Sequence, residues 1–227
     1  MNTAVILAAG KGVRMKPFTE TMPKCLIPIN GRPFLGYLLD AAKAAGITRF
    51  VVVVGYLGET VNAFFKGQGI AAEFIEQREQ LGTGHALLQA KDALGTMNFL
   101  VMGADNLWSP EDIKSMLVDD GFSYVAAIES GHPERYGVLV TDDDYLQQIV
   151  EKPVHPPSSL INTGLYKFTP VIFPALENVK PSSRGEIELT DAITSLASLR
   201  MVKVKRVASW LDLGRPEDIP LIEGKVG

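Results

Sequence analysis

The sequence TAVILAAGKGVRMKPFTETMPKCLIP, residues 3–28, indicates how this chain begins to fold. Its first part, Thr3–Ala8, is a short apolar run of the kind found in buried strands. Gly10 and Gly12 follow in the turn, where the lack of a Cβ lets backbone N–H groups approach an anion. In open parallel sheets, ligands bind beyond the carboxyl ends of the strands. We therefore expect this loop to border a phosphate-binding site.

Two basic residues strengthen that interpretation. Arg14 can hold phosphate oxygens with its planar guanidinium, and Lys24 can add a compact positive charge. The loop lacks the G-K-[ST] ending of a P-loop, and Met15 and Pro17 do not fit the helix-opening G-x-G-x-x-G of dinucleotide enzymes. Taken alone, the pattern also fits a glycine-rich turn with two solvated cations.

Strand and helix patterns alternate through the first half of the chain. In order, the predicted elements are the strand Thr3–Ala8, the helix Pro33–Ala45, the strand Arg49–Val54, the helix Glu59–Lys66, the strand Ala71–Ile75, the helix Thr83–Ala93 and the strand Asn98–Met102. Such alternation indicates right-handed βαβ units. It predicts an α/β fold with a mainly parallel sheet and helices on both faces.

Beyond about residue 120 the pattern changes to a succession of strands. These are Ser123–Glu129, Tyr136–Thr141, Tyr145–Pro153 and Leu160–Phe168, followed by a helix at Ile187–Leu199 and a strand at Met201–Val207. We expect them to add a small mixed or antiparallel β layer against the first half.

The composition argues against several classes of protein. The 227 residues are 46% hydrophobic, which suits one domain with a full-sized core. A net charge of −4 argues against general nucleic-acid binding, which needs a basic surface. Cys25 is the single cysteine, and neither a leader pattern nor a membrane-spanning apolar run is present. We expect a cytoplasmic protein without a membrane or nucleic-acid partner.

The motifs L-A-A-G-x-G-x-R-M-x-P and T-x-x-x-P-K-x-L-I-P-I-x-G-R-P, within residues 7–33, resemble the signature of the sugar-1-phosphate nucleotidylyltransferases. The chain looks like the glucose-1-phosphate thymidylyltransferases and the UTP–glucose-1-phosphate uridylyltransferases, in a short form without a β-helix domain. The resemblance implies a Rossmann-like three-layer nucleotidyltransferase fold with a mostly parallel, mixed central sheet and a small extra β layer. It implies a single domain, 1–227, whose residues up to about 120 bind the nucleotide and whose residues from about 121 bind the sugar phosphate.

This family makes a nucleotide sugar and pyrophosphate from a nucleoside triphosphate and a sugar 1-phosphate. An oxygen of the sugar phosphate attacks the α-phosphorus, so catalysis depends mainly on positioning and charge neutralisation. The resemblance implies three catalytic residues. Arg14 would hold the outer phosphates, Lys24 would stabilise charge at the α-phosphate, and Lys152 would hold the acceptor phosphate.

The resemblance also implies a nucleotide-binding set, namely Leu7, Ala8, Ala9, Gly10, Gly12, Gln77, Gly82 and Thr83. The Gln77 amide can both donate and accept, which suits the imide edge of thymine or uracil, so dTTP or UTP is the expected donor. The alternative is an exposed glutamine before a helix that Thr83 caps. His85 is expected to be a local helix residue and not a catalyst.

A sugar site and a metal site complete the implied machinery. The sugar-binding residues are Gly137, Glu151, Asn162 and Gly164. Asp105 and Asp212 are far apart in the sequence, so they can meet only through the fold. Together they would hold Mg²⁺, with triphosphate oxygens filling its other positions. Ala104 departs from the Gly-Asp pattern of the family at the first aspartate, and Glu186 and Glu188 are expected to be helix caps.

Several alternatives stay open. Glucose 1-phosphate is the expected sugar, but a cytidylyltransferase of a small alcohol phosphate shares the early motifs. A mannose-1-phosphate guanylyltransferase is another alternative, although Gln77 fits a pyrimidine better than guanine. The E-K-P segment at Glu151–Pro153 and the N-T-G segment at Asn162–Gly164 favour the sugar enzymes. A catalytically silent nucleotide-sugar sensor would be expected to lack Lys24 or Asp105, and both are present. Without a β-helix extension, we expect a monomer or a small homo-oligomer.

Overall fold

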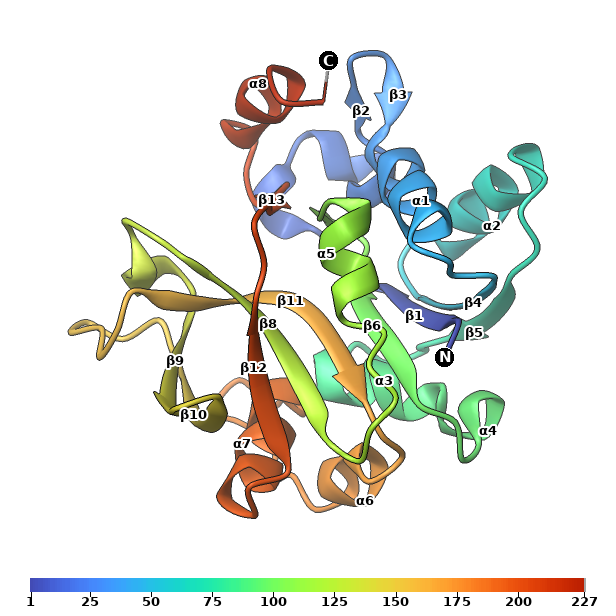
Figure 1. Ribbon diagram of the computed structural model, residues 1–227. Coiled ribbons are helices and arrows are strands. Elements are labelled where there is room, and N and C mark those ends of the chain that lie inside the picture. The colour runs from blue at the N-terminus through green and yellow to red at the C-terminus, as the bar shows by residue number, and fades with distance from the viewer. Residues whose placement is uncertain (227) are drawn as a thin grey trace.

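A computed structural model describes residues 1–226 of the chain (Figure 1). The strands are β1 (Thr3–Ala8), β2 (Pro28–Ile29), β3 (Arg32–Pro33), β4 (Arg49–Val54), β5 (Glu73–Glu76), β6 (Phe99–Gly103), β7 (Asn106–Leu107), β8 (Ser123–Glu129), β9 (Gly137–Asp142), β10 (Tyr145–Glu151), β11 (Leu160–Phe168), β12 (Val202–Arg206) and β13 (Leu211–Asp212). The α-helices are α1 (Phe34–Ala44), α2 (Gly58–Gly67), α3 (Thr83–Gln89), α4 (Lys91–Leu94), α5 (Pro110–Ser115), α6 (Ile172–Glu177), α7 (Leu189–Ser198) and α8 (Asp218–Glu223). Short 3₁₀ helices are η1 (Val13–Met15), η2 (Phe18–Glu20), η3 (Lys24–Leu26) and η4 (Pro133–Arg135).

One central sheet of nine strands has the order β5-β4-β1-β6-β11-β8-β12-β10-β9. Its first part is parallel, because β1 pairs in parallel with both β4 and β6. Leu7 near the end of β1 lies opposite Val53 on one side and Gly103 on the other. The carboxyl ends of these strands therefore share one edge of the sheet, and the glycine-rich loop begins there.

The strands of the second half extend the same sheet. β11 runs antiparallel to β6 and to β8, and β9 folds back to place Val138 opposite Ile161 of β11. The series β11, β8, β12, β10 and β9 is thereby closed by hydrogen bonds. The small β layer that the sequence predicts is thus continuous with the central sheet, because β6 and β11 are direct neighbours. Which half binds which substrate stays a prediction.

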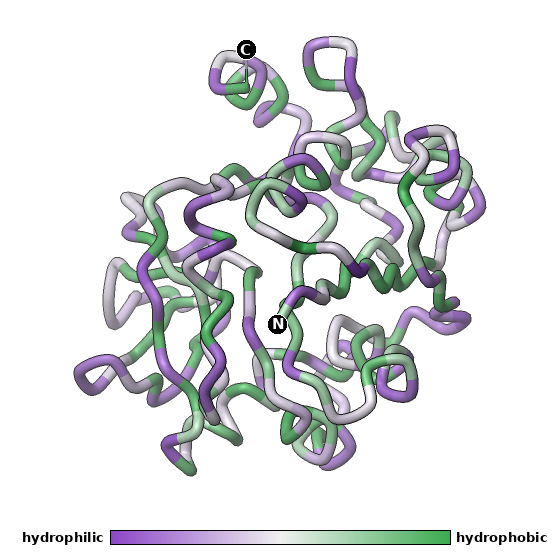
Figure 2. The backbone as a smooth tube through the Cα atoms, turned by 45° about the vertical axis from the view of Figure 1, so that its right-hand side comes forward, coloured by the Kyte–Doolittle hydropathy of each residue, from purple (hydrophilic) through white to green (hydrophobic). Residues whose placement is uncertain are grey.

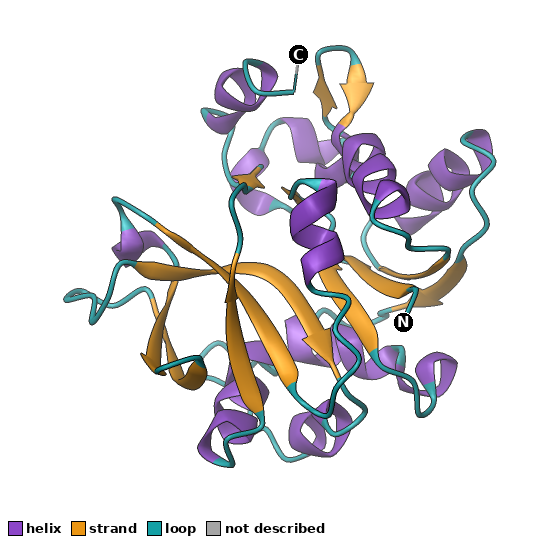
Figure 3. Cartoon of the chain, in the orientation of Figure 1, coloured by secondary structure: helices purple, strands orange, loops and turns teal. Residues whose placement is uncertain are grey.

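The core has two parts, one on each face of the sheet. Alternate residues of a strand point to opposite faces, so Val52 packs with α1 and α2 residues on one face, whereas Val51 and Val53 pack with α3, α6 and α7 residues on the other. This explains why the run Arg49–Val54 is apolar without alternation. Figure 3 shows the helices on the two sides of the sheet, as predicted, and in Figure 2 several of the outer turns are hydrophilic.

Most predicted elements are present with ends shifted by a few residues. The helix predicted over Thr83–Ala93 is two helices, α3 and α4, which meet at Ala90. The short helices α5, α6 and α8 were not predicted, because each has only six residues and too few turns to show a helical period. In the described part of the chain, no helix combines the length and hydropathy that a membrane crossing requires.

Candidate active site

A cleft of about 530 Å³ opens at the carboxyl ends of β1 and β6. Residues from the loop after β1, the β5–α3 connection, the loop after β6 and strand β11 all contribute to its walls. Most of the predicted site residues line it, namely Leu7, Ala8, Ala9, Gly10, Gly12, Arg14, Lys24, Gln77, Gly82, Thr83, Asp105, Glu151, Asn162 and Gly164. The fold thus gathers residues from both halves of the sequence around one hollow.

The glycine-rich loop packs directly on the segment that carries Lys24. Gly12 has a left-handed φ of 61°, and a Cβ there would lie 2.9 Å from Cγ2 of Thr19 and 3.1 Å from Cβ of Lys24. The Thr19 hydroxyl also donates to the Gly12 carbonyl oxygen at 2.9 Å. Both the backbone conformation and the available space therefore require glycine at this position. The close contact places the stem of Lys24 against the loop.

Lys24 and Asp105 form an ion pair in the cleft. Nζ of Lys24 lies 2.5 Å from Oδ2 of Asp105, and the lysine side chain is only 12% exposed. The other carboxylate oxygen of Asp105 accepts from the Asn106 side-chain amide at 2.9 Å. Burial opposes ionisation of Asp105, but the nearby Lys24 ammonium holds the pKa of this carboxyl below its ordinary value. Asp105 is therefore ionised at neutral pH.

Asp212 lies beside this pair although it comes from the far end of the chain. The two-residue strands β7 and β13 pair with Asp212 opposite Asn106, and the Leu213 amide donates to the Asp105 carbonyl at 2.9 Å. Burial and then the charge of Asp105 raise the pKa of Asp212. The charged groups that act on Asp212 are the carboxylates of Asp105 and Asp218 and the cations of Lys24 and Arg14, so three carboxylates face two cations and the site has an excess of negative charge.

That excess suits a divalent cation. Carboxylate oxygens are the ligands that Mg²⁺ prefers, and the ion commonly keeps only one or two protein carboxylates when phosphates supply the rest. Within residues 1–226, no group of three or more potential metal-binding side chains is present. A metal held by Asp105 and Asp212 would therefore need further oxygen ligands from a substrate or from water.

Ala104, the departure from the family pattern, fits without strain. Its side chain is 3% exposed and belongs to the core, and its amide donates to the Leu7 carbonyl at 3.1 Å. Ala104 thus packs in the core, and it also borders the cleft next to Asp105. Gly103 is the sterically restricted position, because a Cβ there would lie 2.8 Å from Nδ2 of Asn106.

Gln77 and Gly82 border another part of the cleft. Gln77 follows β5, is 4% exposed, and donates from Nε2 to the Gly82 carbonyl oxygen at 3.1 Å. Gly82 has φ 96°, and a Cβ there would lie 2.7 Å from the Ile187 carbonyl oxygen. Gln77 is therefore buried, and the alternative of an exposed glutamine is wrong. Gly82, not Thr83, is the N-cap of α3.

The predicted sugar residues lie at the β10 and β11 side of the cleft. Asn162 donates to the Tyr166 hydroxyl at 2.7 Å and accepts from the Gly164 amide at 3.0 Å, so its side chain is fixed within a β-bulge of β11. Gly164 has φ 81°. A Cβ at Gly137 would lie 3.1 Å from Oε1 of Glu151, so glycine leaves room for that carboxylate.

Three predicted residues do not line the cleft itself, namely Gly137, Lys152 and Asp212. Lys152 is exposed, has φ 44°, and follows Glu151 where β10 ends. Asp212 is adjacent to the cleft through Asp105. The roles of all three stay predictions.

The structure adds cleft residues that the sequence patterns did not identify. Arg184 and Glu188 line the cleft and are 2.7 Å apart, and Glu188 also accepts from Ser182. Glu188 is the N-cap residue of α7, but its side chain makes no capping hydrogen bond, so the expected capping role is wrong for it. Tyr166 and Asn106 line the cleft as well. No local motif marks these residues, because they reach the cleft only through long-range packing.

Comparison with known proteins agrees with this geometry. The profile of the nucleotidyl transferase family matches residues 3–225. UTP–glucose-1-phosphate uridylyltransferase AglF of Haloferax volcanii is 39% identical over 225 residues, which cover 95% of this chain and 92% of that protein. The bifunctional protein GlmU of Methanocaldococcus jannaschii is 41% identical over 219 residues, which cover 95% of this chain and 52% of that protein, so the chain spans about half the length of this relative.

Solved structures share the fold. A UDP-glucose pyrophosphorylase complexed with UDP-glucose superposes with a TM-score of 0.89 at 25% identity, covering 100% of this chain and 98% of that one. A glucose-1-phosphate thymidylyltransferase described as putative, from Bacillus anthracis, gives 0.87 at 26% identity, with coverages of 98% and 94%. These similarities confirm the predicted α/β nucleotidyltransferase fold and the resemblance to sugar-1-phosphate nucleotidylyltransferases. The chain belongs to the nucleotidyl transferase family.

Proposed function

We propose that this protein transfers a nucleotidyl group from a nucleoside triphosphate to a sugar 1-phosphate and releases pyrophosphate. One observation carries the proposal. A single cleft contains a phosphate-binding type of loop, the Lys24–Asp105 pair, a buried glutamine and the sugar-side residues Glu151 and Asn162. The similarity to AglF, whose name describes UTP and glucose 1-phosphate as its substrates, supports the same class of reaction here.

The proposed chemistry is a direct displacement. An oxygen of the sugar phosphate forms a bond to the α-phosphorus while the bond from that phosphorus to the bridging oxygen of pyrophosphate breaks. Arg14 holds the leaving phosphates, Lys24 neutralises charge that grows on the α-phosphate, and Lys152 holds the attacking phosphate. Preorganised cations of this kind are the main source of catalysis in phosphate transfer. Among residues 1–226, Asp105 is the one acceptor that Nζ of Lys24 reaches, so its other protons can bind phosphate oxygens.

We propose Mg²⁺ as the cofactor, held by Asp105 and Asp212. The ion would neutralise triphosphate charge. The excess of carboxylate charge beside the cleft supports this assignment.

For the nucleotide we propose UTP or dTTP, and for the sugar glucose 1-phosphate. The buried amide of Gln77 supports a pyrimidine with an imide edge more than guanine.

We also propose a cytoplasmic location. Cys25 is buried, and burial raises the pKa of its thiol to about 12, which fits an unreactive cysteine. A monomer or small homo-oligomer stays the prediction for the assembly.

A pyrophosphate-release assay tests the proposal. Nucleoside triphosphates are crossed with sugar 1-phosphates, with Mg²⁺ or with EDTA. We expect turnover with UTP or dTTP plus glucose 1-phosphate, and loss of turnover in EDTA. Release with CTP and a small alcohol phosphate, or with GTP and mannose 1-phosphate, would favour the rival enzymes. Tight nucleotide-sugar binding without any release would support the silent sensor.

A further inference from the structure

His85 and Gln89 are side chains of α3 that do not line the cleft. His85 contacts Gln77, and Gln89 contacts His85. They instead line a separate small hollow together with Glu76, Arg78 and Glu79. Gln77 lies between the two spaces, since it lines the cleft and contacts the His85 ring. His85 therefore cannot touch a ligand in the cleft directly, but it can act on Gln77.

Two glutamine amides converge on this imidazole. Nε2 of Gln77 lies 2.9 Å from Nδ1 of His85, and Nε2 of Gln89 lies 3.2 Å from its Nε2. A neutral imidazole has one donor nitrogen and one acceptor nitrogen. Only one of the two amides can therefore donate to the ring, and the other must present its oxygen.

The Gly82 carbonyl decides which amide donates. It can only accept, and it lies 3.1 Å from Nε2 of Gln77. Turning the Gln77 amide over would bring two oxygens together where the side chain is 4% exposed and water has little access. Gln89 is only half-buried, and its competing contact, to the His85 carbonyl, is 3.3 Å long. Turning Gln89 is therefore the less costly choice.

A defined hydrogen-bond chain follows from this choice. Nδ1 of His85 accepts from Gln77, Nε2 of His85 carries the proton, and the oxygen of Gln89 accepts it. Both N–H groups of Gln77 are then used, one by Gly82 and one by His85. No donor among the described residues is hydrogen-bonded to the remaining atom, Oε1 of Gln77. The group that Gln77 offers to the cleft is therefore an acceptor alone.

We propose that His85, oriented by Gln89, is a positioning residue that fixes the Gln77 amide with its oxygen toward the cleft and so makes the enzyme prefer uracil or thymine over cytosine. The inference rests on the proposed function, in which the cleft binds a nucleoside triphosphate. N3 of uracil and thymine carries a hydrogen that this oxygen can accept. N3 of cytosine is itself an acceptor, so the two lone pairs would repel each other. Without the histidine, only the Gly82 carbonyl holds the amide in this orientation, so turning it over to offer a donor to cytosine costs one hydrogen bond less.

The test measures discrimination between UTP and CTP. His85→Phe keeps an aromatic ring but removes the acceptor, whereas His85→Asn places Oδ1 near the position of Nδ1. We expect His85→Phe to lower the ratio of kcat/KM for UTP to that for CTP by about tenfold, the effect of one hydrogen bond. The change should lie in KM, with kcat nearly unchanged. His85→Asn should recover most of the ratio.

Two variants of Gln89 form a matched pair, because this residue acts on Gln77 only through His85. Gln89→Glu leaves a group that can only accept, so it should keep the wild-type ratio. Gln89→Leu frees the ring to change its proton and should lower the ratio by a smaller factor than His85→Phe. Equal ratios in wild type, His85→Phe and Gln89→Leu would overturn the inference.

NMR of ¹⁵N-labelled histidine in the unliganded protein gives a readout independent of activity. We expect His85 to carry its proton on Nε2, and a proton on Nδ1 would contradict the hydrogen-bond chain. The two failures are distinguishable. A wild-type protein that neither binds nor turns over a nucleoside triphosphate contradicts the proposed function. A wild-type protein that prefers UTP, with a His85→Phe variant that prefers it equally, contradicts this inference alone.

Discussion

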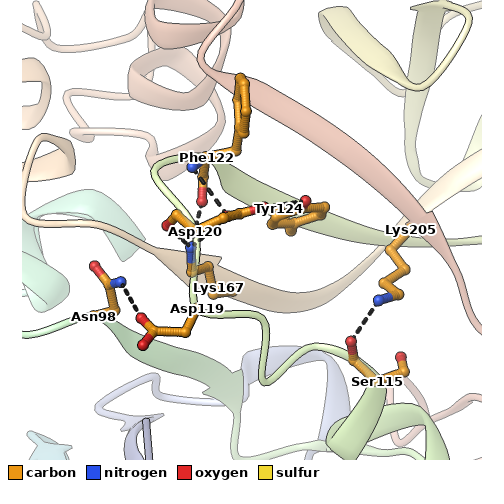
Figure 4. Close-up of polar contacts among 8 residues, drawn as sticks. All are labelled: Asn98, Ser115, Asp119, Asp120, Phe122, Tyr124, Lys167 and Lys205. Carbon is orange, nitrogen blue, oxygen red and sulfur yellow. Dashed lines mark hydrogen bonds and ion pairs between the residues drawn. The ribbon is translucent and has the colours of Figure 1, made fainter.

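Two lysine–aspartate pairs in this molecule look alike in composition and differ in what surrounds them. Lys24 and Asp105 meet in the cleft, whereas Lys167 of β11 and Asp120 meet beyond the opposite end of the sheet (Figure 4). The Lys167 side chain has no exposed surface, and its ammonium donates to the Asp120 carbonyl at 2.8 Å, to Oδ1 of Asp120 at 3.1 Å and to the Phe122 carbonyl at 2.6 Å. All three protons of this lysine are used.

The carboxylate of Asp120 accepts three hydrogen bonds from the protein. It accepts from the Tyr124 hydroxyl at 2.7 Å and from the Phe122 amide at 3.1 Å, in addition to Lys167 (Figure 4). Burial and then the hydrogen bond to Asp120 raise the pKa of Tyr124 to about 12, so this hydroxyl stays a donor. The network ties the loop before β8 to β11 and leaves Lys167 no proton with which to bind a ligand.

The cleft pair is the opposite case. Lys24 reaches one acceptor within residues 1–226, and a second carboxylate, Asp212, adds negative charge nearby. A lysine whose three protons are all donated within the protein stabilises the fold. A lysine with free protons, beside a further carboxylate, is instead suited to binding a ligand. The comparison predicts that mutations at the two lysines affect different properties.

The largest effect is expected at the cleft pair. Lys24→Ala should lower kcat by about a hundredfold or more, because one preorganised charge at a reacting phosphate is worth that much. The melting temperature should change little, since the lysine makes one hydrogen bond there. Steady-state kinetics and calorimetry on the same preparation measure both quantities. Near-normal turnover would contradict the assigned role, and a large loss of stability would make this pair structural.

The complementary change is Lys167→Met. It removes the buried ammonium from three partly buried acceptors, so the free energy of unfolding should fall by about 3 kcal/mol, while turnover per folded molecule stays normal. Urea unfolding and active-site-normalised kinetics are the measurements. Lys205→Met is the control, because Lys205 donates to a single acceptor, the Ser115 carbonyl, and its loss should cost less than half as much. Equal destabilisation by the two variants would show that the number of hydrogen bonds made by the lysine does not determine the loss of stability.

The lowered pKa of Asp120 predicts how the stability provided by this pair depends on pH. Burial opposes its ionisation, but hydrogen bonds from Tyr124 and Lys167 hold the pKa of Asp120 below its ordinary value. A depressed carboxyl pKa stabilises the folded state above the unfolded pKa of about 3.9, and this stabilisation is lost as the pH falls through the folded value. Asp120→Asn should therefore be less stable than wild type at neutral pH, with the difference shrinking in acid. Urea denaturation curves over this range measure it, and a constant difference would exclude the linkage.

The smallest effect is expected at an exposed third lysine. Lys152→Ala should raise the KM for the sugar phosphate by about tenfold with a smaller change in kcat, because its proposed contact is to the acceptor phosphate alone. Its exposure at the end of β10 means that the melting temperature should stay the same. Unchanged KM for both substrates would remove Lys152 from the proposed site and leave the acceptor phosphate to another group, such as Arg184.

Much of the fold and part of the site follow from local patterns. The apolar run of β1, the glycines after it and the alternation up to β6 predicted a parallel sheet with a glycine-rich loop at its carboxyl edge, and the structure has both. That this loop binds phosphate stays a prediction. Gly12 and Gly82 could be singled out by their positions in the sequence motifs, and the structure shows a positive φ and a close neighbour at each. The two-residue strands β7 and β13 could not be predicted, because so short a pairing has no period to detect.

The sequence by itself therefore determined the α/β layers, the family and the residue types available for phosphate, since each depends on neighbours within a few positions. Only the tertiary structure decided that Asp212 lies beside Asp105, that Lys167 is saturated while Lys24 is not, and that His85 contacts Gln77. The physical reason is that hydrogen-bond satisfaction and charge balance are sums over all neighbours in space. These neighbours come from strands and loops far apart in the chain, so no local pattern records them.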